Sequence, residues 1–114
     1  MSPITTHVLD TARGTPAWGI VVVLEVSDGA HGWFELGRGI TGDDGRIAAF
    51  DPPLAALEPG VYRLRFATGD YFAANRVSSF YPEVHVVVRI DDPAQHYHVP
   101  LLLSPFGYST YRGS

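Results

Sequence analysis

The feature that most constrains this chain is a series of short β-type segments, each ended after a few residues by glycine, proline or aspartate. In residues 19–26 (GIVVVLEV) alternate positions are apolar, and residues 33–40 follow a turn-forming SDGAHG as the second strand of a hairpin. Residues 61–67 (VYRLRFA) and 84–90 (VHVVVRI) alternate in the same way. Each strand therefore has one apolar face, and a second sheet is needed to cover it.

The rest of the chain extends this pattern. Asp44-Gly45 is a favoured tight-turn pair, so Arg46 is expected to open a short strand. Residues 96–104 (HYHVPLLLS) and 107–111 are two further strands. We therefore predict an all-β, two-sheet antiparallel sandwich of seven or eight strands with one short helix.

Two details of this prediction depend on single residues. Pro100 donates no backbone hydrogen bond, so its strand is expected at a sheet edge or bulged there. The one helix is predicted within residues 68–79 (TGDYFAANRVSS), with Thr68 or Asp70 as its cap.

Length and composition limit the class of protein. With 114 residues, 46% of them hydrophobic and 18% charged, residues 1–114 are expected to form one soluble domain. All eight basic residues are arginine and the net charge is −4, which disfavours a nucleic-acid-binding surface. Cysteine is absent, so thiolate catalysis and thiolate metal sites are excluded. With no apolar run of membrane-spanning length and no signal-peptide pattern at the start, we expect a cytoplasmic protein that does not enter a membrane.

Two histidines are the first candidates for chemistry. His96 and His98 are two residues apart on a predicted strand, so both side chains project from the same face. Three interpretations stay open: the rings are structural, they bind a metal with ligands from elsewhere, or one is a general base. No compact metal-ligand motif accompanies them.

Other candidates are weaker when taken singly. His7 lies in a stretch of strand character (ITTHVLD) and shares a face with Thr5. Taken alone, His7 is interpreted as a structural residue. Arg46 is individually typical of a surface charge, although a guanidinium fork matches a planar, anionic ligand. No serine lies in a nucleophile-elbow motif. The last four residues combine an aromatic ring, a guanidinium, a glycine that permits the chain to turn back, and a hydroxyl, in Tyr111, Arg112, Gly113 and Ser114.

Three stretches of the sequence occur together in one known family. They are ITTHVLDTARGTPA, TGDDGR and HYHVPLLLSPFGYSTYRGS. On these motifs, nearly the whole chain resembles the 5-hydroxyisourate hydrolases, the transthyretin-related enzymes of urate breakdown. The resemblance implies a transthyretin-like (prealbumin-like) sandwich of eight strands and a homotetramer with its sites at the interface between dimers. The apolar surface expected for such an assembly is Val87 with the face of Leu101 and Leu103.

The resemblance also implies a reaction and the residues that carry it. The reaction is hydrolytic opening of the six-membered ring of 5-hydroxyisourate to 2-oxo-4-hydroxy-4-carboxy-5-ureidoimidazoline, without a metal or organic cofactor. The implied catalytic residues are His7, Arg46 and His98. The implied substrate-binding residues are His7, Arg46, Tyr111, Arg112, Gly113 and Ser114. Which histidine is the general base, and what His96 does, stay open.

Two other functions are compatible with the same fold. One is a carrier, since transthyretin itself carries thyroid hormone, and the other is an interaction module without an active site. A carrier has no need for His7, Arg46, His98 and the hydrolase tail together, so their joint presence favours the enzyme.

Overall fold

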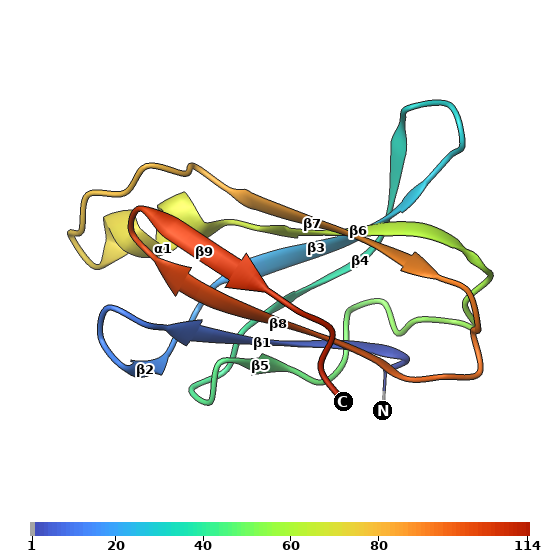
Figure 1. Cartoon of the computed structure of the whole chain (residues 1–114), viewed down its shortest axis with the longest axis horizontal. Coiled ribbons are helices and arrows are strands. Elements are labelled where there is room, and N and C mark those ends of the chain that lie inside the picture. The colour runs from blue at the N-terminus through green and yellow to red at the C-terminus, as the bar shows by residue number, and fades with distance from the viewer. Residues whose placement is uncertain (1) are drawn as a thin grey trace.

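The computed structural model of this chain describes residues 2–114. Within this range it has nine strands and one helix, and the strands form two sheets packed face to face (Figure 1). The predicted two-sheet sandwich with one short helix is thereby confirmed, with nine strands in this range rather than the predicted seven or eight, because the two-residue strand Thr15–Pro16 was not predicted. The elements are β1 (Ile4–Asp10), β2 (Thr15–Pro16), β3 (Val21–Ser27), β4 (Trp33–Ile40), β5 (Arg46–Ile47), β6 (Gly60–Phe66), α1 (Thr68–Ala74), β7 (Val84–Ile90), β8 (Tyr97–Ser104) and β9 (Gly107–Thr110).

The two sheets have different strand orders. The first, which we name the site sheet, has the order β2-β1-β8-β9 with β5 also paired to β1, and the second has the order β4-β3-β6-β7. Every pair is antiparallel except β1 and β8, which run parallel. The antiparallel prediction therefore has one exception. The chain between β1 and β8 includes the whole second sheet, a connection long enough for a parallel return.

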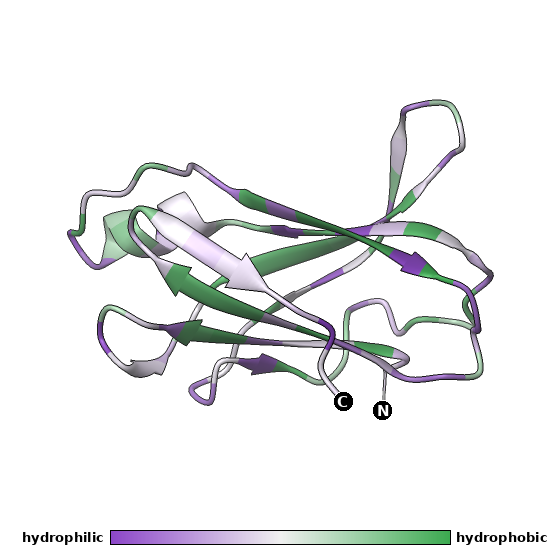
Figure 2. Ribbon diagram, viewed as in Figure 1, coloured by the Kyte–Doolittle hydropathy of each residue, from purple (hydrophilic) through white to green (hydrophobic). Residues whose placement is uncertain are grey.

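The core lies between the sheets and is filled from alternate positions of the strands. Figure 2 shows apolar residues gathered along β3 and β8, on opposite sides of this core. Leu101 and Leu103 of β8 are 0% and 1% exposed, so the expectation that they form an outer apolar face is wrong. Successive side chains alternate, and Leu102 is the leucine on the outer face with His98. Val87 on β7 is 56% exposed, as expected.

Pro100 lies on a central strand, because β8 pairs with β1 on one side and β9 on the other. The expectation of an edge strand or bulge is therefore wrong. The carbonyl of His98 accepts a hydrogen bond from Gly113 (2.9 Å), and Pro100, two residues on, directs its backbone to the same side. On that side the β8/β9 ladder ends at the Leu101 and Thr110 pair. The missing N–H of Pro100 thus coincides with the place where β9 gives way to the C-terminal tail.

The helix is confirmed but its predicted caps are wrong. The N-cap position is Ala67, which makes no side-chain capping hydrogen bond, and Thr68 is the first helical residue. Within residues 2–114 the buried Thr68 hydroxyl has no hydrogen-bond partner. The helix buries Tyr71 and Phe72 against the core and ends before Arg76, whose φ is 58°. No helix in this part of the chain is both long and apolar enough to cross a membrane.

Candidate active site

A tight turn places Arg46 opposite His7. The Gly45 N–H bonds to the Gly42 carbonyl (2.9 Å), and the Asp44 carboxylate accepts from the Arg46 N–H (2.9 Å). Gly45 has a φ of 76°, and a Cβ there would lie 2.4 Å from the carbonyl oxygen of Val8. Glycine is thus required both for the backbone conformation and for the close approach to β1. The predicted turn and short strand are confirmed, and β5 pairs with β1 so that Arg46 is directly opposite His7.

The parallel pairing of β1 and β8 adds His98 to the same face. Thr5 of β1 is in register with His98 of β8. Because directly paired residues project from the same side of a sheet, Thr5, His7, Arg46 and His98 share the outer face of the site sheet. The structure therefore brings the three residues predicted as catalytic together from β1, β5 and β8.

A threonine missed at the level of the sequence lies between two histidines on this face. The Thr5 hydroxyl oxygen is 2.8 Å from Nδ1 of His98 and 3.2 Å from Nε2 of His96. His96 and His98 do share a face, as predicted. The alternation of ITTHVLD places Thr5 beside His7, but only the register of β1 against β8 reveals its contact with His98.

The surroundings of His98 favour a neutral ring. Burial is the main cause that lowers the pKa of His98 from its usual 6.5, and the positive charge of Arg46 lowers it further, as do His7 and His96. A hydrogen bond to the backbone of Thr5 opposes this shift. A neutral imidazole has one nitrogen with a free lone pair, so His98 can accept a proton at neutral pH.

The C-terminal tail packs directly against His98. Gly113 forms an isolated β-bridge with His98, and a Cβ at Gly113 would lie 2.6 Å from Cδ2 of the imidazole. Gly113 does not adopt a positive φ, so glycine is not needed there for its backbone conformation. Its small size is what allows the tail to contact the ring.

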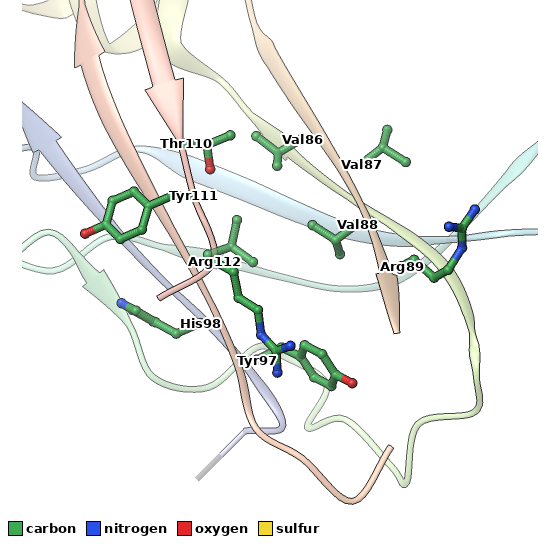
Figure 3. A pocket seen from close by; sticks show the side chains of 10 residues that line it. Val86, Val87, Val88, Arg89, Tyr97, His98, Thr110, Tyr111 and Arg112 are labelled. Atoms are coloured by element: carbon green, nitrogen blue, oxygen red, sulfur yellow. The ribbon is translucent and has the colours of Figure 1, made fainter. Parts of the chain in front are cut away.

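Two pockets meet at His98. One, of about 290 Å³, is lined by residues that include Thr5, Arg46, His96, His98 and Ser114. The other, of about 330 Å³, lies between β7 and the tail and includes His98, Tyr111 and Arg112 (Figure 3). The tail residues predicted to bind substrate therefore lie on both sides of His98, and His7 adjoins the first pocket through its pairing with Arg46.

Arg112 does not point toward Arg46. Its guanidinium stacks 4.6 Å above the Tyr97 ring and donates a 2.7 Å hydrogen bond to Gln95. Figure 3 shows this side chain extended beside Tyr97, with Tyr111 on the side of His98. Tyr111 is 57% exposed. The structure thus brings Gly113 and Ser114 to the cluster of His7, Arg46 and His98, while Arg112 is held elsewhere.

The cluster is cationic and has no carboxylate partners. Within residues 2–114, none of the ion pairs involves His7, Arg46, His98 or Arg112. In the same range, no group of three or more histidine, aspartate or glutamate side chains is arranged to hold a metal ion. An unpaired guanidinium beside a neutral imidazole can bind a planar anion and take a proton from water.

Comparison with known proteins identifies the family. A model described as the HIUase/Transthyretin family matches residues 4–113. The chain belongs to this family. The 5-hydroxyisourate hydrolase of Salmonella dublin is 50% identical over 111 residues, which cover 97% of this chain and 80% of that protein. The resemblance seen in the sequence motifs is therefore confirmed.

Solved structures of the HIUase/transthyretin family share the fold. Klebsiella pneumoniae 5-hydroxyisourate hydrolase matches with a TM-score of 0.84 at 38% identity, covering 97% of this chain and 98% of that one. Sea bream transthyretin, solved in complex with thyroxine, matches with a TM-score of 0.87 at 30% identity, covering 97% and 94%. The fold is thus shared by a hydrolase and a thyroxine-binding protein, and only the residues of the site can separate these functions.

Proposed function

We propose that this chain is a 5-hydroxyisourate hydrolase of urate degradation. It opens the six-membered ring of 5-hydroxyisourate to give 2-oxo-4-hydroxy-4-carboxy-5-ureidoimidazoline. The observation that carries the proposal is the cluster of His7, Arg46 and His98, which has no carboxylate partners within residues 2–114. The identity to named 5-hydroxyisourate hydrolases over nearly the whole chain supports it.

The proposed reaction needs a general base and an electrophile. A water molecule held by His7 and His98 attacks a ring carbonyl carbon, and its proton passes to a histidine. Arg46 stabilises the negative charge that develops on the carbonyl oxygen. The ring C–N bond then breaks, the leaving nitrogen takes a proton, and the new carboxyl group remains on the product. We assign the base to His98, because its pKa is lowered and its ring is oriented by the Thr5 hydroxyl, 2.8 Å from Nδ1.

The tail is proposed to close the site. Gly113 contacts His98 and Ser114 lines the pocket with Arg46, so both are near the substrate. Tyr111 is proposed to hold the flat ring of the substrate. Arg112 is proposed as a second guanidinium. It lines the pocket between β7 and the tail together with His98, while it contacts Tyr97 and Gln95.

The setting of the reaction is also a proposal. Residues 1–114 are proposed to form one hydrolase domain that works in the cytoplasm, without a metal or organic cofactor, as a homotetramer with sites at the dimer–dimer interface. The outer face of the site sheet supports assembly, because it carries the half-buried Leu9 and Leu102 next to His7 and His98. Size-exclusion chromatography with light scattering tests this, and a stable, active monomer would contradict it.

The decay of ultraviolet absorbance of freshly generated 5-hydroxyisourate tests the function. Wild type is expected to accelerate the decay, whereas His98→Asn and a chain lacking residues 111–114 are expected to be folded and nearly inactive. Full activity of the folded, truncated chain would remove the tail from the site. Activity that is lost with a chelator and restored by zinc would contradict the metal-free mechanism. Binding of thyroxine without any turnover would favour a carrier.

A further inference from the structure

Thr5 is a buried polar residue of the site face to which the proposed mechanism assigns no chemical step. Its side chain is on β1, directly across from His98, and the residue is 8% exposed. Its hydroxyl contacts Nδ1 of His98 at 2.8 Å and Nε2 of His96 at 3.2 Å. A hydroxyl has one hydrogen to donate, so the two rings cannot both receive it.

The positions of the acceptors decide where the hydrogen atoms lie. A neutral His98 carries one N–H, either on Nδ1 or on Nε2. Nδ1 has the Thr5 oxygen as an acceptor, whereas within residues 2–114 no protein group hydrogen-bonds to Nε2. A hydrogen on Nδ1 is therefore satisfied by the protein, and Thr5 can then donate its own hydrogen to His96. If Thr5 instead donated its hydrogen to Nδ1, the hydrogen of His98 would lie on Nε2, where it has no protein acceptor within residues 2–114.

The charges around the ring favour the same arrangement. Arg46 of β5 and His7 of β1 are near His98, as are His96 and the tail residues Tyr111 and Arg112. None of these side chains carries a carboxylate, and Ser114 lines the same pocket as Arg46 and His98. A cation prefers to face a nitrogen lone pair rather than an N–H. Because Thr5 occupies Nδ1, a cation that approaches the open side of the ring meets Nε2 and disfavours a hydrogen there.

We propose that Thr5 is a positioning residue of the hydrolase: its hydroxyl holds His98 as the Nδ1-protonated tautomer and leaves Nε2 free to take the proton of the attacking water. His96, as the acceptor of the Thr5 hydrogen, completes the chain of hydrogen bonds. Gly113 abuts Cδ2 of the same ring, so the imidazole is fixed from two sides. The role of Thr5 in catalysis depends on the proposed hydrolase function, but its effect on the tautomer does not.

The tautomer is measured directly by nitrogen NMR of the histidine side chains. In wild type, His98 is expected to carry its hydrogen on Nδ1 at pH 7. In Thr5→Val, which keeps the shape and loses the hydroxyl, this preference is expected to be lost, and Thr5→Ser is expected to restore it. A wild-type His98 protonated on Nε2, or an unchanged tautomer in Thr5→Val, would overturn the proposal.

Kinetics provide the second readout. Thr5→Val is expected to lower kcat about tenfold with little change in KM, because a lost hydrogen bond releases the ring while the substrate contacts remain. The acid limb of the pH profile of kcat/KM is expected to move to lower pH, since the imidazolium loses an acceptor at Nδ1. Thr5→Ser is expected to recover most of kcat. Wild-type kcat and pH profile in a folded Thr5→Val would contradict the catalytic role.

Thr6→Val is the matched control, because Thr6 is the next residue of β1 and faces the core. Its hydroxyl donates a 2.6 Å hydrogen bond to the Val99 carbonyl. Its loss is expected to lower the thermal midpoint without changing the His98 tautomer. If wild type does not hydrolyse 5-hydroxyisourate but the tautomer responds to Thr5→Val, the proposed function fails and the positioning by Thr5 stands.

Discussion

The outer faces of the two sheets both carry arginine side chains, but arginine–carboxylate pairs lie on the second sheet, whereas Arg46 on the site sheet is unpaired in the described part of the chain. On the second sheet, Oε1 of the buried Glu25 lies 2.8 Å from Nε of Arg63 and 3.6 Å from Nε of Arg65. Arg63 also stacks 4.4 Å from the Trp33 ring. On the site sheet, Arg46 and the histidines have no carboxylate partner within residues 2–114. A buried carboxylate that loses its partner is left as an uncompensated charge, whereas an unpaired cationic cluster remains able to bind an anion. We therefore expect changes on the second sheet to affect stability and changes on the site sheet to affect function.

Among the variants that compare the arginines and the tail, removal of the Arg46 side chain is expected to have the largest effect. Arg46→Ala is expected to lower the rate of 5-hydroxyisourate hydrolysis about 10²–10³-fold, since it removes the donor that we propose stabilises the developing charge. Its free energy of unfolding is expected to change by only about 0.5 kcal/mol, because Arg46 is exposed and unpaired. Initial rates and denaturant unfolding measure the two quantities. If Arg46→Ala lost stability as well as rate, Arg46 would have a structural role like that of the paired arginines on the second sheet.

Gly113→Ala tests the contact between the tail and His98. The new Cβ displaces the imidazole or the tail, and a misplacement of about 1 Å costs up to about 10²-fold in rate. Gly107→Ala on β9 is the matched control, since the nearest atom to its new Cβ is 3.7 Å away. Steady-state kinetics of both variants measure the effect. Equal rates for the two would mean that the tail does not position His98.

Arg63→Ala addresses the opposite face. It leaves Glu25 with only the more distant Arg65 and removes the contact with Trp33. The free energy of unfolding is expected to fall by about 1–3 kcal/mol, as for a buried polar group that loses its main partner. At equal amounts of folded protein, the hydrolysis rate is expected to match wild type. A rate loss as large as that of Arg46→Ala would show that both faces contribute to the site.

The smallest expected effect is the pH dependence of stability. The pKa of His98 in the folded protein lies below its usual 6.5, so the unfolded chain binds this proton more readily. The contribution of His98 to stability is therefore present above pH 6.5 and is lost as the pH falls toward the folded value. His98→Asn is expected to flatten this part of the curve of unfolding free energy against pH. An unchanged curve would mean that the ring is not desolvated.

The sequence predicted most strands because their alternation is local. The Asp44-Gly45 turn and the strand that Arg46 opens follow from turn chemistry alone, and both are present. The parallel pairing of β1 with β8 could not be predicted, since it depends on how distant segments meet. For this reason, the contact between Thr5 and His98 was missed.

The wrong prediction for Leu101 and Leu103 could have been avoided from the local sequence. His98 on the outer face places Leu101 and Leu103 inward by alternation, so the expected apolar face contradicted the expected site. The stacking of Arg112 on Tyr97 and the packing of Gly113 against His98 depend on the path of the tail, which no local pattern describes.

The most direct test of this account is the rate of 5-hydroxyisourate hydrolysis in a matched pair of histidine variants. His98 has no carboxylate partner within residues 2–114, whereas Nε2 of His85 on β7 lies 2.7 Å from Glu83. The rate of His98→Asn is expected to be about 10²–10⁴-fold lower than that of wild type, as for removal of a general base, and His85→Asn is expected to keep the wild-type rate. Equal rates for the two folded variants would contradict the assignment of the active site to the outer face of the site sheet.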